Sequence, residues 1–138
     1  MQENLLLNQE KKQLLDNAKV IAVVGLSDNP GRPSNRIGKY LQSEGYKVVP
    51  INPLLQEVLG EKSYPDLKSV PYDIDIVDIF RRSEEVHAIV EEAEELKIPA
   101  IWVQVGIECN EETIELAKAS NMKLIQNCCI MVEHRMLK

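Results

Sequence analysis

Four of the five arginines in the chain occur as two close pairs, and arginine is the residue type best suited to bind a phosphate. One pair is Arg32 and Arg36, and the other is Arg81 and Arg82. A guanidinium group binds phosphate through parallel hydrogen bonds, and a helix N-terminus offers unpaired N–H groups to the same anion. The spacing predicts a local anion site, but solvated arginines that pair with the many glutamates would give the same pattern.

Five short apolar runs have the composition of parallel strands that are buried on both faces. Helical patterns separate them: one is expected to begin at Ser34 as its N-cap, one at Ser83, and one covers 111–120. Strands that alternate with helices predict right-handed crossovers. The expected fold is therefore α/β, a Rossmann-like, doubly wound, mainly parallel five-stranded sheet with helices on both faces. The predicted strands are 19–25, 46–51, 74–80, 99–104 and 122–125.

A chain of 138 residues has room for one domain, so residues 1–138 are expected to form a single unit. A further helix is predicted over 4–17, packed outside the sheet, and a short helix is predicted from Ile130 onward. In an open parallel sheet, ligands bind beyond the carboxyl ends of the strands, where the strand order reverses. The loops expected to form the site are Gly25–Ser34, Asn52–Leu55, Phe80–Ser83 and Gln104–Cys109.

A nicotinamide dinucleotide is the first alternative that such a fold suggests. Gly25 is followed by Leu26 and Ser27, so the G-x-G-x-x-G fingerprint is missing, and no Gly-Lys-Ser/Thr marks a P-loop. An NAD site also uses an acidic residue after the second strand, where this chain has Asn52 and Pro53. Asn52 lacks the carboxylate that would repel an extra phosphate on the ribose, which indicates a nucleotide with such a phosphate.

Several motifs occur in order along nearly the whole chain, and together they are specific. With them the chain resembles the stand-alone CoA-binding proteins of bacteria and archaea, a family similar to the N-terminal CoA-binding domain of the succinyl-CoA synthetase alpha subunit. One departure is Asn127-Cys128-Cys129, where many relatives have Asp-Arg-Cys. The matching segments are Val23-Val-Gly-Leu-Ser27 with Arg32-Pro-Ser34, Val49-Pro-Ile-Asn-Pro53, Val77-Asp-Ile-Phe-Arg81, Trp102-Val-Gln-Val-Gly106 and Cys129-Ile-Met-Val-Glu-His134.

The resemblance implies a role for each loop. The first loop would receive the diphosphate, the second would lie near the adenosine, the third would line the pocket, and the fourth would flank the pantetheine arm. The residues implied are Gly25, Leu26, Ser27, Arg32 and Ser34 in the first loop, Asn52 and Pro53 in the second, Phe80 and Arg81 in the third, and Gln104 and Gly106 in the fourth.

The expected function is non-covalent binding of coenzyme A or acyl-CoA by a sensor, carrier or regulatory module without catalysis of its own. In the synthetase the catalytic machinery lies outside the domain that this chain resembles, so the resemblance implies binding only. Two alternatives stay open: a small NAD(P)-dependent oxidoreductase, and an interaction subunit that docks on a separate acyl-CoA ligase chain.

The composition limits the partners. A net charge of −6 argues against a nucleic-acid ligand, and no run of residues suggests a signal peptide or a membrane span, so a cytoplasmic protein is expected. Cys109, Cys128 and Cys129 are expected to be unbonded thiols, and no metal-binding spacing is present. A homodimer or docking to another enzyme would be compatible with this sequence.

Three aspartates occur around the third predicted strand: Asp73 precedes it, and Asp75 and Asp78 lie within it. Neighbouring positions on a strand point to opposite faces, so they are not expected to act as a catalytic pair. We expect them at strand edges and in loop contacts. Trp102 is expected to be a packed core residue.

Overall fold

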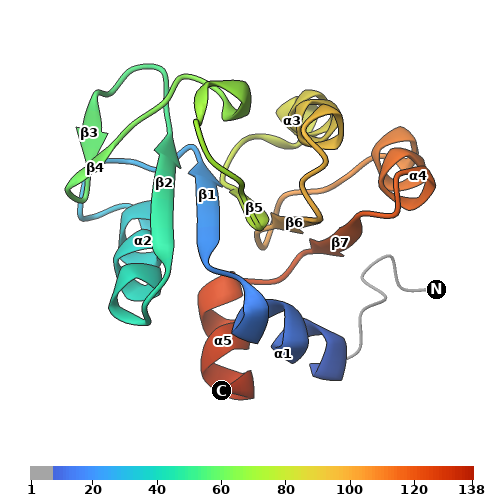
Figure 1. Ribbon diagram of the computed structural model, residues 1–138, viewed down its shortest axis with the longest axis horizontal. Helices are drawn as coiled ribbons and strands as arrows, with labels where there is room; N and C mark the ends of the chain where they lie inside the picture. Colours follow the sequence, from blue (N-terminus) through green and yellow to red (C-terminus); the bar gives the residue numbers. More distant parts are fainter. Residues whose placement is uncertain (1–7) are drawn as a thin grey trace.

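The computed structural model describes residues 8–138, and its centre is one sheet of five parallel strands (Figure 1). The strand order is β2-β1-β5-β6-β7, so the order reverses between β1 and β5. The first four strands are shorter than their predicted runs by one to three residues, because Gly, Pro and polar residues end the ladders, and the fifth has the predicted length but begins one residue later. The expected doubly wound α/β fold is confirmed. The strands are β1 (Val20–Val24), β2 (Lys47–Ile51), β5 (Ile76–Ile79), β6 (Ala100–Val103) and β7 (Lys123–Gln126).

Helices cover both faces of this sheet, as expected (Figure 1). On one face lie α3 (Ser83–Glu95) and α4 (Glu111–Ala119), and on the other lie α1 (Asn8–Asn17), α2 (Pro33–Ser43) and α5 (Ile130–Leu137). Alternate residues of each strand feed the two cores: in β1, Ala22 packs toward α3, whereas Val23 packs toward α2 and α5. The predicted helix over 4–17 is seen from Asn8; its first four positions lie outside the described residues.

The connection from β2 to β5 contains elements that the sequence pattern does not reveal. A two-stranded hairpin joins β3 (Glu57–Val58) to β4 (Glu61–Lys62), and a short 3₁₀ helix, η1 (Leu67–Ser69), follows it. Asp66 caps η1 by accepting the N–H of Ser69 at 3.0 Å. This connection brings η1 onto the α3 face of the sheet, beside the carboxyl end of β2.

Two residues expected to begin helices do not act as N-caps. Arg32 occupies the N-cap of α2 and Arg82 that of α3, and neither side chain makes a capping hydrogen bond. The hydroxyl of Ser34 instead accepts the N–H of Ser27, and that of Ser83 accepts the N–H of Glu108. Both predictions were wrong because Ser34 and Ser83 lie inside the first turns of their helices, where their hydroxyls bind the loop that leads into α2 and the loop after β6.

Asp78 corrects the expectation of a strand-edge role, because it lies inside β5 with no exposed surface. Its neighbours in the sheet are Val23 and Trp102, and neither of its oxygens has a hydrogen-bond partner among the described residues. Burial raises the pKa of Asp78 well above its ordinary value. Asp75 does lie at the strand edge, where its carboxylate accepts the N–H groups of Lys19 and Val20.

The α1 and α5 helices are joined to the rest by buried polar contacts. Lys11 donates to Glu133 at 3.2 Å, and both side chains are less than one fifth exposed. His134 lies 2.6 Å from the hydroxyl of Tyr40 on α2, and burial lowers the pKa of this histidine. Trp102 is fully buried, as expected, and its indole N–H donates to the carbonyl of Cys128 at 3.1 Å. Within residues 8–138, no helix is both long and apolar enough to cross a membrane.

Candidate functional site

The loops that follow β1 and β5 come into direct contact where the strand order reverses. Gly25 has φ +91° and donates its N–H to Ile51, and Phe80 donates its N–H to Val24. A Cβ on Gly25 would collide with the carbonyl oxygen of Phe80 and would lie 3.0 Å from Cδ of Arg81. The glycine is therefore required both by its backbone conformation and by this close approach.

The first loop is a rigid turn that leads into α2. Ser27 is at its centre: its N–H donates to Ser34, its carbonyl accepts from Asn35, and its hydroxyl accepts the N–H of Asn29. A hydroxyl that accepts can also donate, so the Ser27 side chain has a proton to offer to a ligand. Arg32 is exposed at the start of α2, whereas Ser34 is buried and stabilises the loop through its hydrogen bond with Ser27.

The second loop is held against the first by Asn52. Its side-chain amide donates to the carbonyl of Leu26 at 3.1 Å, and its side-chain oxygen accepts the N–H of Leu54. Leu26 itself is fully buried. Asn52 and Leu26 therefore fix the position of the loop, whereas the adjacent Pro53 is exposed and lines a hollow.

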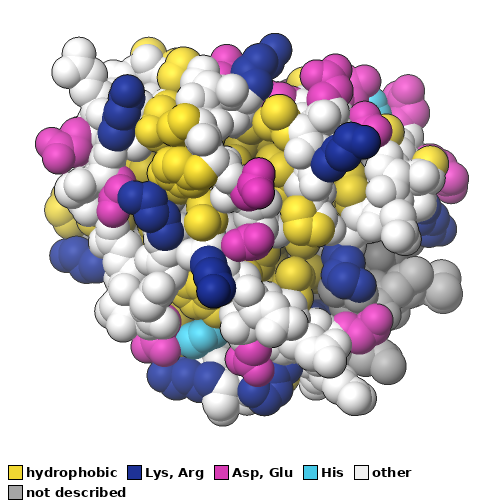
Figure 2. Space-filling model, in the orientation of Figure 1, with side chains coloured by type: hydrophobic (Ala, Val, Ile, Leu, Met, Phe, Trp, Pro, Cys, Tyr) yellow, Lys and Arg dark blue, Asp and Glu magenta, His cyan; other side chains and the backbone are white. Residues whose placement is uncertain are grey.

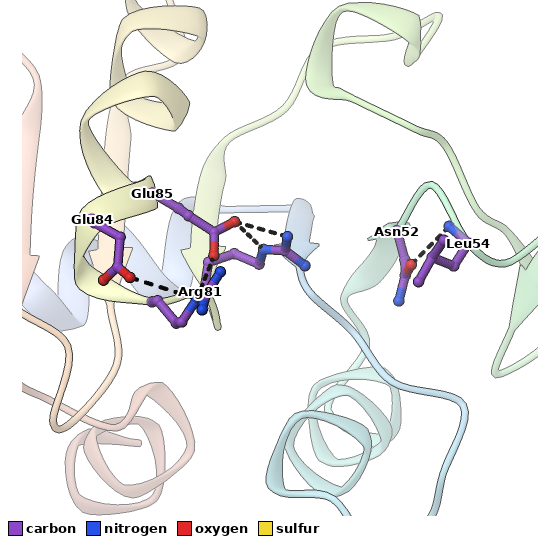
Figure 3. Close-up of polar contacts among 6 residues, drawn as sticks. Asn52, Leu54, Arg81, Glu84 and Glu85 are labelled. Atoms are coloured by element: carbon purple, nitrogen blue, oxygen red, sulfur yellow. Dashed lines mark hydrogen bonds and ion pairs between the residues drawn. The ribbon is translucent and has the colours of Figure 1, made fainter.

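Arg81 and Arg82 both pair with one glutamate in the first turn of α3 (Figure 3). Arg81 donates to Oε1 of Glu85 at 2.8 and 3.0 Å, and Arg82 donates to Oε2 at 3.2 Å. Glu84 lies 3.7 Å from Arg82. The hydrogen bonds from Arg81 hold the pKa of the Glu85 carboxyl below its ordinary value. The alternative that arginines pair with glutamates thus holds for this pair of arginines, while Arg36 donates to the carbonyl of Gly31.

The fourth loop contains one buried and one exposed residue of the expected set. Gln104 is only 4% exposed, and its side-chain oxygen accepts the N–H of Ile130 at the start of α5. Gly106 is exposed, has φ +87°, and donates its N–H to Asn127. Gln104 therefore positions α5, whereas Gly106 lines a hollow that is open to solvent.

Two hollows lie beside each other along the first turn of α3, and both are lined by Arg81, Glu84 and Glu85. One, of about 420 Å³, extends toward Pro53 and has largely apolar walls. The other, of about 710 Å³, extends toward Gly106 and is open to solvent. The further residues that line the first are Val24, Ile51, Pro65, Asp66, Leu67, Ala88, Ile89 and Glu92, and those that line the second are Phe80, Arg82, Ser83 and Ile107.

Sequence reasoning missed the wall that Pro65, Leu67 and Ile89 form. Pro65 and Leu67 come from the connection between β2 and β5, which carries no strong period, and Ile89 comes from an expected helix. For the Arg81–Glu85 ion pair, by contrast, the i,i+4 spacing was a usable signal, although Arg81 lies two residues before α3 begins.

A third hollow, of about 570 Å³, lies at the opposite edge of the sheet, where β5 and β6 begin. It is lined by residues such as Tyr72, Asp75 and Lys97. None of the residues expected to bind a ligand lies there, and ligands of doubly wound sheets bind at the carboxyl edge. We therefore place the candidate site at the two hollows beside α3.

The cysteines lie outside both hollows. None of the three forms a disulfide bond among the described residues, and burial raises the pKa of Cys109 to about 11, which keeps this thiol protonated at neutral pH. Cys128 and Cys129 are partly buried on the α5 side of the sheet. Among residues 8–138, no group of histidine, cysteine and acidic side chains is arranged to hold a metal ion.

Residues 19–135 match the sequence model of a CoA binding domain. YneT of Bacillus subtilis, described as uncharacterized, is 42% identical over 129 residues, which cover 94% of this chain and 95% of YneT. An ADP-forming acetate–CoA ligase of Archaeoglobus fulgidus is 32% identical over 124 residues; the match covers 83% of this chain but only 18% of the ligase. A solved structure of a hypothetical protein from Pyrococcus horikoshii has a TM-score of 0.93 at 34% identity, and covers 97% of this chain and 94% of that one.

Proposed function

The chain belongs to the CoA-binding domain family, and from this premise we propose that it binds coenzyme A or an acyl-CoA non-covalently at the two hollows beside α3. The observation that carries the proposal is the position of Arg81. Its side chain lines both hollows and lies against Gly25, at the point where the strand order reverses. A long ligand with phosphates near its middle would therefore reach both hollows from this arginine.

The two hollows suit the two ends of such a ligand. The apolar walls of the hollow beside Pro53 suit an adenine ring, and its Asp66 and Glu92 already accept the N–H groups of Ser69 and Lys68. The open hollow beside Gly106 would accept the pantetheine arm. The diphosphate would lie between them, near Arg81 and the Ser27 hydroxyl, with Arg32 at the start of α2 adding positive charge.

We propose binding without catalysis by this chain. Neither hollow is lined by a histidine or a cysteine, and the hydroxyl of Ser83, which lines the open hollow, accepts the backbone N–H of Glu108. A sensor, carrier or regulatory role then follows from the binding of the ligand alone.

Thermal unfolding with a series of ligands tests the proposal, because a ligand that binds only the folded state raises the apparent stability. CoA and acetyl-CoA are expected to raise Tm, dephospho-CoA less, and NAD and NADP not at all. Isothermal titration gives the affinities. R81M is expected to weaken CoA binding about tenfold, as for the loss of a charged hydrogen bond.

The matched control is R135M, which removes an arginine that lies on α5 over the ring of Tyr40. It is expected to bind CoA as the natural chain does. Folded protein that is stabilised by none of the CoA compounds would contradict the proposal. Stabilisation by NAD or NADP alone would instead support the oxidoreductase alternative.

The similarity to the acetate–CoA ligase supports a second candidate, in which the chain docks on a separate catalytic chain. The ligase carries the matching segment within a much longer protein, so the domain described here would act together with a catalytic part that lies outside it. Affinity purification of the tagged protein with and without CoA would test this. Recovery of the protein alone under both conditions would count against it.

A further inference from the structure

The Arg81–Glu85 ion pair lies where the two hollows adjoin. Arg81 and Glu85 line both hollows, and Glu85 belongs to the first turn of α3. The stem of Arg81 lies against Gly25, and its guanidinium ends on Oε1 of Glu85. The side chain therefore extends from the loop after β1 to α3, between the hollow beside Pro53 and the hollow beside Gly106. Figure 3 shows this pair, with Asn52 on the facing loop.

This ion pair can be exchanged for another partner. Its side chains are 39% and 30% exposed, and pairs that reach solvent to this degree contribute little net stability. Glu85 uses its second oxygen for Arg82, so that one carboxylate holds both arginines. A phosphate presents the same bidentate acceptor geometry as a carboxylate and carries more negative charge.

We propose that the Arg81–Glu85 pair is a latch, in which a ligand phosphate replaces Glu85 as the partner of Arg81 and thereby joins the two hollows into one groove. Glu85 competes with the ligand and so lowers affinity, and the latch selects ligands that carry a phosphate beside the apolar hollow. This inference rests on the proposed function, since it assigns how the same site opens. It makes Glu85 a residue that opposes binding.

Two single substitutions on α3 separate this effect from simple charge removal. E85Q replaces the charged acceptor of Arg81 with a neutral amide, whereas E84Q removes an equal charge from the same turn; Glu84 lines both hollows and forms its ion pair with Arg82. By isothermal titration E85Q is expected to bind CoA about three- to tenfold more tightly than the natural chain, and E84Q to gain less than about twofold. Equal gains in the two variants would show that only charge matters and would overturn the latch.

A double substitution tests whether Glu85 acts through Arg81. In an R81M background, E85Q is expected to give no further gain beyond that of E84Q, because Arg81, the arginine that the proposal assigns to the ligand phosphate, is gone. A full gain without Arg81, or a loss of affinity in E85Q alone, would overturn the proposal. Thermal unfolding without ligand shows that each variant is folded.

The two proposals fail in different ways. If the natural chain binds CoA and E85Q matches E84Q, the latch is wrong and CoA binding stands. If neither the natural chain nor E85Q binds CoA, then the proposed function is wrong, and the latch falls with it. Titration with pantetheine, which has no phosphate, is expected to show no gain in E85Q over E84Q.

Discussion

At the scale of single residues, some ionisable side chains form ion pairs near the surface, and one is buried without a hydrogen-bond partner among the described residues. At the carboxyl edge of the sheet, Arg81 and Arg82 are paired with Glu85. Asp78, one position before the end of β5, is enclosed between Val23 and Trp102 and has no hydrogen-bond partner among the described residues. A buried carboxyl group without a partner is stable only when it keeps its proton.

Asp78 should make the stability of the protein depend on pH. Its folded-state pKa lies well above 3.8, so its contribution is fully present below about pH 3.8 and is lost as pH rises through the folded-state pKa. The slope is about 1.4 kcal/mol per pH unit within that window. D78N is expected to remove this slope in urea unfolding measured from pH 4 to pH 8.

The control for this measurement is D73N, which changes an exposed aspartate three residues before β5. It is expected to keep the slope of the natural chain. A D78N variant whose free energy of unfolding follows the natural chain at every pH would show that Asp78 ionises without cost.

At the scale of elements, several features could be predicted from the sequence. The five strands and the helices that follow them were predictable because apolar runs and amphipathic periods recur along the chain. The β3–β4 hairpin was not, because strands of two residues show no period, and only Gly60 marks its turn. The candidate site was predicted in part: Pro53, Phe80, Arg81 and Gly106 line the hollows.

Other residues predicted for the site are buried and stabilise its loops through hydrogen bonds. Ser34 and Gln104 are buried; Ser34 accepts the backbone N–H of Ser27 in the loop before α2, and Gln104 accepts that of Ile130 at the start of α5. A sequence pattern shows that a polar side chain follows a strand, but the packing of the helices decides whether it faces the ligand or the core. The ligand roles of all these residues stay predictions.

The α1 helix is expected to owe part of its attachment to one ion pair. Lys11 and Glu133 are 10% and 18% exposed, whereas the next lysine, Lys12, pairs with Asp16 at 49% and 55% exposure. K11M is expected to lower the free energy of unfolding by about 1–2 kcal/mol, between the values for exposed and buried pairs. Urea unfolding of K11M beside K12M checks this.

K12M serves as the matched control, because it changes the neighbouring lysine of the same helix and breaks only an exposed pair. Its effect is expected to stay below about 0.5 kcal/mol. Equal losses in the two variants would show that burial of the Lys11–Glu133 pair adds nothing.

At the scale of the whole molecule, the charge is distributed unevenly. The net charge is −6, yet four arginines lie at the carboxyl edge of the sheet, on α2 and at the start of α3. Figure 2 shows one face on which basic and acidic side chains are interspersed, with apolar side chains visible between them. The arginines therefore create a local site that attracts anions on a protein whose net charge repels them.

This distribution predicts that salt weakens the binding of CoA. The Debye length falls from about 10 Å at 0.1 M to about 3 Å at 1 M salt, so attraction of the phosphates to exposed arginines is screened. Between 0.05 and 0.5 M KCl, the Kd for CoA is expected to rise about three- to tenfold, and that for dephospho-CoA to rise less. Isothermal titration at four salt concentrations measures both, and a Kd that does not change with salt would contradict an arginine-based site.

The enclosed position of Trp102 has a spectroscopic consequence. As the single tryptophan of the chain, it is the source of the indole fluorescence, and it is shielded from water in the folded protein. Its emission should therefore be blue-shifted in the native state and move to longer wavelength on unfolding. Because Trp102 lines neither hollow, a ligand that fills the site should leave the emission maximum in place, so a shift on ligand addition would report a rearrangement of the core.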